Sequence, residues 1–165
     1  MSKFAPNILN ETGWIKYTHR FDFSYLDIPA GIANNTSKVF GAGYLPVTKI
    51  SDEVIEIFTY LTTPFQNTLD SGFSSTTLDV GDANSATRFA SGIQINANGS
   101  FVTATHGSDK NYIYTAAVQL QINLNSMNMK SLSSLNAGRL YIEWNIFRPS
   151  GVAITQATPF GTGYV

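Results

Sequence analysis

The segment YIYTAAVQLQINL, residues 112–124, alternates apolar and polar side chains along most of its length. Its even-numbered positions are apolar, and Gln119, Gln121 and Asn123 occupy the opposite phase. Because successive side chains of a β-strand point to opposite faces, this alternation predicts one long strand with a buried face and a wetter face. The side chains predicted to be buried are Tyr112, Tyr114, Ala116, Val118, Leu120, Ile122 and Leu124.

Three further segments predict long strands. Residues 138–147 (GRLYIEWNIF) and 17–25 (YTHRFDFSY) alternate in the same way. Residues 53–63 (EVIEIFTYLTT) are β-branched and aromatic in both phases, as expected of a central strand that is covered on both faces. In the first of these segments the side chains predicted to be buried are Leu140, Ile142, Trp144 and Ile146.

Shorter strand-like runs between turn residues occupy residues 75–80, 91–96 and 100–105. The dipeptide Asn98-Gly99 separates the last two runs, which predicts a hairpin. No long window shows a persuasive helical stripe. The sequence therefore predicts an all-β fold, an antiparallel β-sandwich or jelly roll, with a single domain over residues 14–148.

The two ends of the chain, residues 1–13 and 149–165, lack this alternation and contain proline, so we expect them to be extended arms. Both nevertheless carry apolar side chains, and such segments usually lie on another subunit or on the surface of their own domain. The expected result is a homo-oligomer, a trimer or a dimer, whose arms bind partners. The candidate partner contacts are Phe4, Ile8, Leu9, Val152, Ile154, Phe160 and Tyr164.

The composition argues against several classes of partner. Charged residues make up 13% of the 165 residues, where soluble domains typically carry about 25%. The net charge is −1 and no basic run is present, which argues against nucleic acid, because phosphate binding needs clustered lysine and arginine. There is no cysteine, no apolar run of membrane-spanning length and no signal-peptide core. We therefore expect synthesis in a cytoplasm and no membrane partner.

The segment LDVGDANSATRFASG, residues 78–92, has the most site-like composition, because Asp79 and Asp82 flank Gly81. A calcium loop needs oxygen ligands at alternating positions and a distal glutamate, and neither is present. A phosphate cradle needs more glycines than one. The preferred interpretation is a strand end and a structural turn whose polar side chains cap backbone amides, with a metal loop as the lesser alternative.

The residues that could support catalysis are few. His19 lies on the apolar phase of a predicted strand, which is typical of a buried histidine, and His106 lies in a short polar stretch that cannot form a catalytic triad alone. Glu56 and Glu143 lie within strands and could face each other across a sheet, as glycosidase carboxylates do. Nothing in the spacing requires this, so no catalytic, cofactor or metal site is predicted.

Four aromatic residues, Phe58, Tyr60, Tyr141 and Phe147, occupy phases that can face outward from their strands. Outward aromatic side chains stack on sugar rings or, more commonly, fill protein interfaces. They belong to the core if both faces of the sheet are covered.

An ordered series of short motifs carries a resemblance to a known family. The motifs are GAGYL (41–45), VIEIFTYLTTPF (54–65), LDVGDANSATRF (78–89) and AGRLYIEWNIFRPSG (137–151). Together they resemble small β-rich virion proteins of tailed bacteriophages, most closely a capsid decoration (cement) protein of a cyanophage-like virus, over residues 40–150.

The resemblance implies a non-enzymatic β-sandwich that binds the major capsid protein in many copies on the capsid surface and stabilises the head. The alternatives are a tail, baseplate or head-tail joining subunit that forms a ring, and a carbohydrate-binding receptor module. No cofactor is expected for any of these roles.

Overall fold

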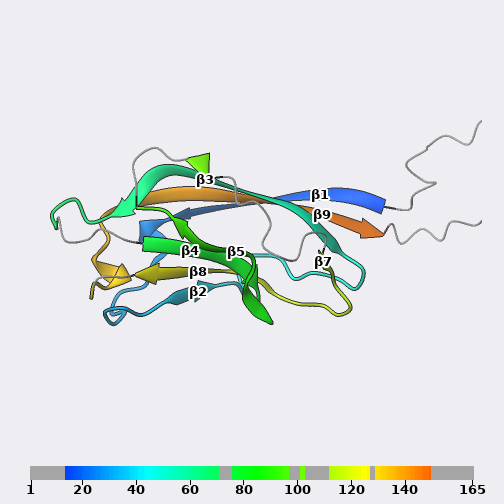
Figure 1. The fold of residues 1–165 in the computed structure, drawn as a ribbon, viewed down its shortest axis with the longest axis horizontal. Helices are drawn as coiled ribbons and strands as arrows, with labels where there is room; N and C mark the ends of the chain where they lie inside the picture. The colour runs from blue at the N-terminus through cyan, green and yellow to red at the C-terminus, as the bar shows by residue number, and fades with distance from the viewer. Residues whose placement is uncertain (1–13, 71–75, 97–100, 103–111, 127–128, 150–165) are drawn as a thin grey trace, which may run out of the picture.

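The computed structural model describes residues 14–70, 76–96, 101–102, 112–126 and 129–149. Its strands form two antiparallel sheets (Figure 1). Sheet A has the order β1-β9-β3-β6, and β7 also pairs with β3; sheet B has the order β2-β8-β4-β5. The strands of sheet A are β1 (Trp14–Ser24), β3 (Glu53–Gln66), β6 (Phe101–Val102), β7 (Tyr112–Ile113) and β9 (Ala137–Pro149). Those of sheet B are β2 (Lys38–Phe40), β4 (Thr76–Asp82), β5 (Ser85–Gln94) and β8 (Leu120–Ser126).

The connectivity is that of a jelly roll. Along the chain, β1, β2, β3 and β4 alternate between sheets A and B, and β4 and β5 form a hairpin within sheet B. The chain then returns to sheet A in β6 and β7, crosses to sheet B in β8 and enters sheet A again in β9. This alternation places β9 between β1 and β3, and β8 between β2 and β4. The predicted all-β sandwich is therefore confirmed.

The only helices in the described part of the chain are two short 3-10 turns, η1 (Tyr25–Asp27) and η2 (Leu132–Ser134). Neither is long or apolar enough to cross a membrane. The absence of a helical stripe in the sequence agrees with this arrangement.

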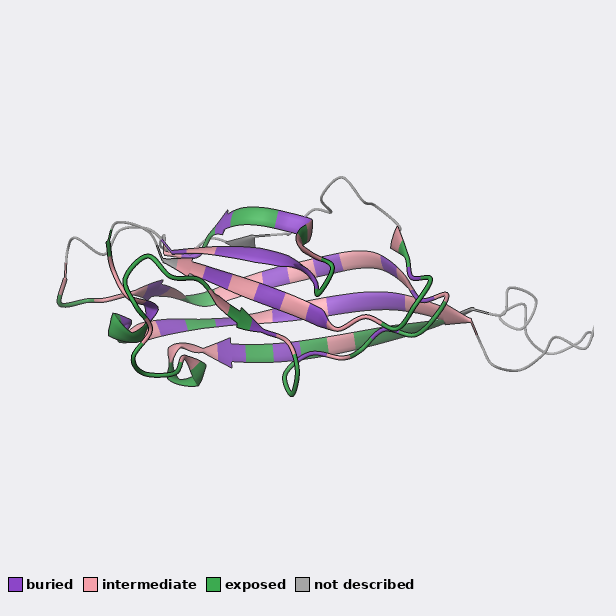
Figure 2. Ribbon diagram, turned by 90° about the horizontal axis from the view of Figure 1, so that it is seen from below, coloured by how far each residue is buried: buried purple, intermediate pink, exposed green. Residues whose placement is uncertain are grey.

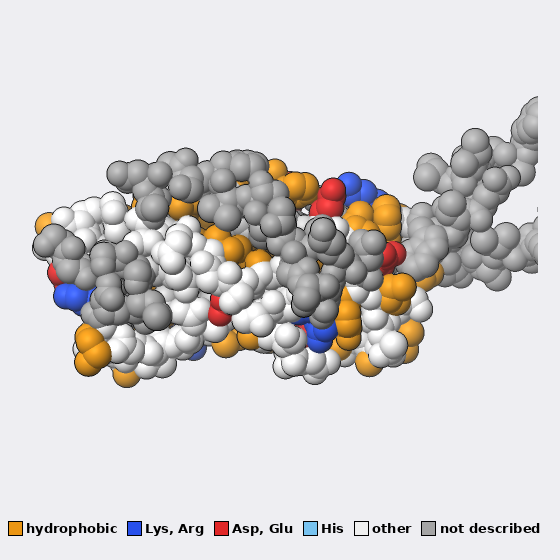
Figure 3. All heavy atoms as spheres, viewed as in Figure 1, with side chains coloured by type: hydrophobic (Ala, Val, Ile, Leu, Met, Phe, Trp, Pro, Cys, Tyr) orange, Lys and Arg blue, Asp and Glu red, His pale blue; other side chains and the backbone are white. Residues whose placement is uncertain are grey.

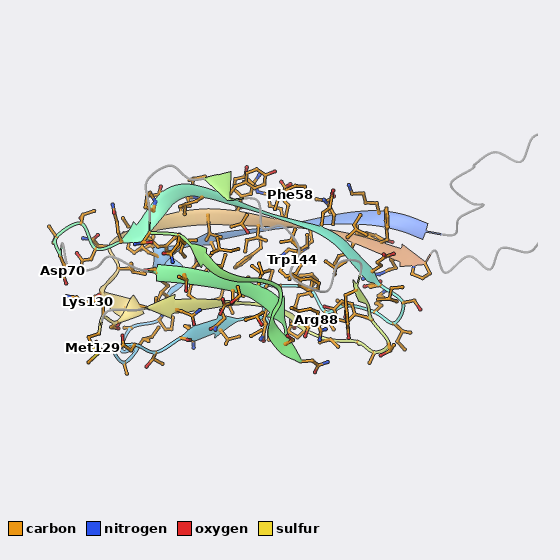
Figure 4. The ribbon with its side chains drawn as sticks, viewed as in Figure 1. Phe58, Asp70, Arg88, Met129, Lys130 and Trp144 are labelled. Atoms are coloured by element: carbon orange, nitrogen blue, oxygen red, sulfur yellow. The ribbon has the colours of Figure 1, made fainter. Side chains whose placement is uncertain are left out.

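The core lies between the inner faces of the two sheets. Trp144 of β9 is fully buried and packs edge to face on Phe89 of β5, with ring centroids 5.8 Å apart, so this pair links sheet A to sheet B. Figure 4 shows Trp144 between the sheets. The alternation of β8 and β9 is as predicted: Leu120, Ile122, Leu124, Leu140, Ile142, Trp144 and Ile146 are all buried.

A second aromatic group anchors the C-terminal half of β1. Phe23 is buried and lies 4.6 Å from Phe40 of β2 and 5.8 Å from Phe65 of β3, measured between ring centroids. Gly138 of β9 lies directly against Phe65, and a Cβ atom at this position would be 2.4 Å from the ring. The N-terminal half of β1 has no such packing, since residues 15–18 are all exposed (Figure 2).

The prediction of one long strand over residues 112–124 is wrong. The segment begins in β7 of sheet A and ends in β8 of sheet B, so it crosses between the sheets. At the break, Tyr114 donates its amide to the carbonyl of Asp52 (2.8 Å) and accepts from the amide of Ser51 (2.7 Å), and Ala116 is exposed rather than buried. The alternation indicates which side chains of a strand face the core. Because both sheets pack against the same core, it does not indicate which of the two sheets a segment joins.

One local prediction is corrected and one is confirmed. The expected hairpin at Asn98-Gly99 would pair the strands on either side of it, but β5 belongs to sheet B whereas β6 pairs with β3 in sheet A. The interpretation of the stretch after Asp82 as a strand end and a structural turn is confirmed, because β5 begins at Ser85 and only two residues connect β4 to β5.

Candidate partner-binding surface

Both terminal segments are attached to the same end of sheet A. Trp14, the first residue of β1, pairs with Pro149, the last residue of β9. We call this end of the sandwich the arm end (Figure 1). The predicted contacts themselves lie outside the described residues: Phe4, Ile8, Leu9, Val152, Ile154, Phe160 and Tyr164.

An exposed apolar surface surrounds the arm end. Ile15 pairs with Arg148 next to the strand ends, and Ile113 pairs with Glu53 at the start of β3. Val47 and Ile50 lie on the segment that enters β3. We call this group of exposed residues the arm-end surface; its members are Ile15, Tyr17, Val47, Ile50 and Ile113. Each of these residues is between 43% and 67% exposed, and Figure 3 shows hydrophobic side chains gathered at this end.

A buried ion pair fixes the geometry of the arm end. The carboxylate of Asp52 is fully buried and accepts two hydrogen bonds from Arg148, from Nε and Nη2, both at 2.7 Å, and one from the amide of Lys49 at 2.8 Å. The hydrogen bond from Arg148 to Asp52 raises the pKa of the guanidinium. Since Asp52 precedes β3 and Arg148 is near the end of β9, this pair ties the root of the C-terminal segment to the crossover from sheet B.

A second buried carboxylate supports the same end from sheet B. Asp82 accepts hydrogen bonds from the amides of Asn84 and Ser85 (2.9 Å each), from Nε of Arg88, and from the hydroxyl of Tyr114 (2.7 Å). The prediction that an aspartate here caps backbone amides is therefore confirmed. Burial, together with this hydrogen bond, raises the pKa of Tyr114 well above its ordinary value. The guanidinium of Arg88 lies 3.9 Å from the ring centroid of Tyr112, and Figure 4 labels Arg88.

The carboxylate of Asp79, the other aspartate of this segment, also accepts hydrogen bonds from groups of the protein. It accepts from the amide of Gly92 (2.8 Å), the hydroxyl of Ser91 (3.2 Å) and the side-chain amide of Asn125 (2.8 Å). Gly81, between the two aspartates, is required by close packing, because a Cβ atom there would lie 2.1 Å from the carbonyl oxygen of Ser85. Within the described ranges, no group of three or more His, Cys, Asp or Glu side chains is placed to hold a metal ion.

Three of the four aromatic residues that can face outward, Phe58, Tyr60 and Tyr141, lie together on the outer face of sheet A. The rings of Tyr60 and Tyr141 are stacked with centroids 4.4 Å apart and planes 18° apart, and Arg20 lies 3.7 Å over Tyr141. Phe58 lies on the same outer side, 6.3 Å from Tyr60 (Figure 4). A sugar-binding platform presents ring faces to solvent. Here both ring faces of Tyr141 are covered, one by Tyr60 and the other by Arg20, and Tyr141 covers one face of Tyr60, so these ring faces are not open to a sugar.

The candidate catalytic residues do not converge. Glu56 pairs in register with Asn145, whose side-chain amide donates to it at 3.2 Å, whereas Glu143 pairs with Phe58. The two glutamates therefore lie diagonally on one face of sheet A and do not oppose each other across a cleft. His19 is half-buried on β1, and His106 lies outside the described residues.

Sequence reasoning missed the two arginine–aspartate pairs at the arm end. Asp52 and Arg148 are separated by 96 positions, so no local pattern relates them. Asp82 and Arg88 could have been found, because a two-residue turn after Asp82 would bring β5 back alongside it. The exposed arm-end surface depends on where sheet B ends below sheet A, which alternation alone does not specify.

Comparisons with known proteins identify a similar fold. No protein-family model matches the chain, and no curated protein sequence matches it. Among solved structures, the chain is similar to a chain of the structure described as the cyanophage Pam1 capsid asymmetric unit. The alignment has a TM-score of 0.56 and 14% sequence identity, and it covers 90% of this chain and 93% of the other. At this identity the likeness establishes a shared jelly-roll fold.

Proposed function

We propose that this chain is a non-enzymatic bacteriophage virion protein that binds the capsid exterior and stabilises the head. The observation that carries the proposal is the arm end. There, both terminal segments join the sandwich beside the exposed apolar arm-end surface, and two buried arginine–aspartate pairs hold the supporting strands. The fold likeness to a chain of a cyanophage capsid supports a role in the virion.

The binding mechanism follows from what the arm end exposes. Residues 1–13 and 150–165 carry apolar side chains, and ordering such segments on a partner costs conformational entropy. Burial of apolar area, at about 25 cal/mol per Å², offsets this cost most readily where the segments and the arm-end surface contact one partner together. The partner is the major capsid protein, and many copies of a homo-oligomer, a dimer or a trimer, bridge neighbouring capsid subunits.

Sedimentation with capsids tests this proposal. Purified protein is mixed with heads of the parent virus that lack it and is centrifuged; full-length protein is expected in the pellet. Deletion of residues 1–13 and the substitution Ile50→Asp should each weaken pelleting, because one removes apolar anchors and the other places a charge in the arm-end surface.

The matched control is Leu69→Asp, an equally drastic change at an exposed position beyond the opposite end of β3. It should pellet like the unmodified protein, and thermal melts should show that all variants are folded. Full pelleting of both the deletion and Ile50→Asp would contradict attachment through the arm end. Assembly into closed rings without any capsid binding would replace the proposal with the tail or head-tail joining role.

A further inference from the structure

Strand β1 is a long, regular edge of sheet A. Its 11 residues pair with β9 without a register shift, from Trp14↔Pro149 to Ser24↔Arg139. By contrast, the pairing of β3 with β9 is interrupted by three shifts. In the part of the chain that the structure describes, no strand pairs with the other side of β1, which lies along the border of the sandwich in Figure 2.

This edge lacks most of the features that usually block pairing. Folded proteins protect an exposed edge with short strands, proline, bulges or charged side chains, and of these β1 carries only charged side chains, at Lys16, Arg20 and Asp22. In sheet B, the edge strand β2 has only three residues, and the edge strand β5 is interrupted by register shifts against β4. Strand β1 contains no proline, no glycine and no shift, and its side chains at residues 15–18, 20 and 22 are exposed. Within the described residues, the backbone groups on this side of β1 are therefore open to another strand.

The charges along β1 are complementary to a second, antiparallel copy of the same strand. Two-fold pairing that uses the whole strand places His19 opposite itself, Lys16 opposite Asp22 of the second copy, and Thr18 opposite Arg20. A shift of the axis by one residue toward the N-terminus would oppose Lys16 and Arg20, and a shift toward the C-terminus would oppose Arg20 and Arg20. Like charges directly opposite each other destabilise a pair of strands.

We infer that β1 pairs with β1 of a second copy to form a two-fold dimer with one continuous sheet A. The interface is isologous, because each copy contributes the same strand. The antiparallel arrangement directs the two arm ends in opposite directions. With a rise of about 3.4 Å per residue, the two Trp14 residues lie about 34 Å apart. The inference does not require capsid binding, and it is tested on the isolated chain.

Single cysteines test the pairing directly, because the chain contains no natural cysteine. Residues that face each other across antiparallel strands have Cα separations within the range that a disulfide spans. In the full chain, His19→Cys should form a covalent dimer under mild oxidation. Lys16→Cys alone and Asp22→Cys alone should not, since each residue lies about 20 Å from its own counterpart. An equimolar mixture of these two variants should cross-link. Thr115→Cys, an exposed position outside β1, gives the collision background.

A charge exchange provides a second measurement if His19→Cys is poorly folded. Lys16→Asp or Asp22→Lys alone should weaken dimerisation about tenfold in sedimentation velocity, because two attractive pairs become repulsive in each dimer. The double variant should restore the dimer to within about twofold. Lys16 and Asp22 are six residues apart on one strand, too far to contact each other within one copy, so a recovery requires the intermolecular pairing.

Three results would overturn the inference. The first is a monomeric full-length chain together with cross-linking of His19→Cys no faster than that of Thr115→Cys. The second is preferential cross-linking of Lys16→Cys alone, which would require another register. The third is cross-linking of His19→Cys that appears only after residues 1–13 are deleted, which would assign the edge of β1 to the chain's own N-terminal arm.

Discussion

The substitution Arg148→Met tests whether the buried ion pair holds the arm end together. In the native protein, Asp52 is completely buried and receives two of its three hydrogen bonds from Arg148. Methionine keeps an unbranched apolar side chain but removes both charged donors, together with the guanidinium group whose central carbon lies 4.9 Å from the centroid of the Tyr17 ring. The carboxylate is then left with the amide of Lys49 alone. Removing one partner of a buried ion pair typically lowers the free energy of unfolding by about 3–5 kcal/mol, because the other charge stays buried without compensation.

The structure favours the lower end of that range. The side chain of Arg148 remains 23% exposed, so water already weakens part of the interaction. We expect a loss of about 3 kcal/mol in the free energy of unfolding, measured by urea denaturation. For a chain of this size, that corresponds to a decrease of roughly 6–12 °C in melting temperature.

The pair Arg20 and Asp22 supplies a matched control. It has the same chemistry and comparable geometry, with Nε and Nη2 of Arg20 at 3.2 and 3.0 Å from the carboxylate, but both side chains are about half exposed. Arg20→Met should therefore leave the urea midpoint almost unchanged, because exposed ion pairs contribute little. Equal effects of Arg148→Met and Arg20→Met would refute the argument that burial makes the first pair important.

Three further predictions concern the core and the buried carboxylates. Trp144→Ala should cost about 3–5 kcal/mol in unfolding free energy, because it removes the ring that packs on Phe89 between the sheets; a neutral effect in denaturation would contradict this packing. Because the pKa of Tyr114 is raised in the folded state, only the unfolded chain loses this proton as the pH rises above about 10, so stability should fall there. Tyr114→Phe should reduce that fall in pH-dependent denaturation, and an unchanged slope would contradict the assignment. Thermal melts with and without a chelator should coincide, because protein donors occupy Asp79 and Asp82; a large decrease on chelation would revive the metal-loop alternative.

The strands that could be predicted from the sequence are those whose alternation is uninterrupted within one sheet. β9 is the clearest case, since Leu140, Ile142 and Trp144 face the core and the neighbouring residues face outward. Residues 112–124 have an equally regular pattern and yet divide between two sheets. The division at Tyr114 depends on a hydroxyl that reaches Asp82 and on backbone bonds to the segment before β3. These contacts are distant in sequence, and no local period encodes them.

The candidate surface was predictable only in outline. The apolar side chains of the terminal segments indicate partner binding, but only the pairing of Trp14 with Pro149 shows that both segments join the sandwich at one place. The edge position of β1 could not be predicted from the sequence either. Its alternation predicts a strand, whereas its position at the border of sheet A follows from the jelly-roll order.

A reconstruction of the intact virus particle by electron cryomicroscopy tests the proposed function most directly. Maps of particles with this protein and of particles made without it should differ by density on the outside of the head. That density should fit the two-sheet sandwich with its arm-end surface in contact with the capsid shell. Difference density confined to the tail or to the head-tail junction, or a head surface identical in the two maps, would contradict the proposal that this chain is a capsid decoration protein.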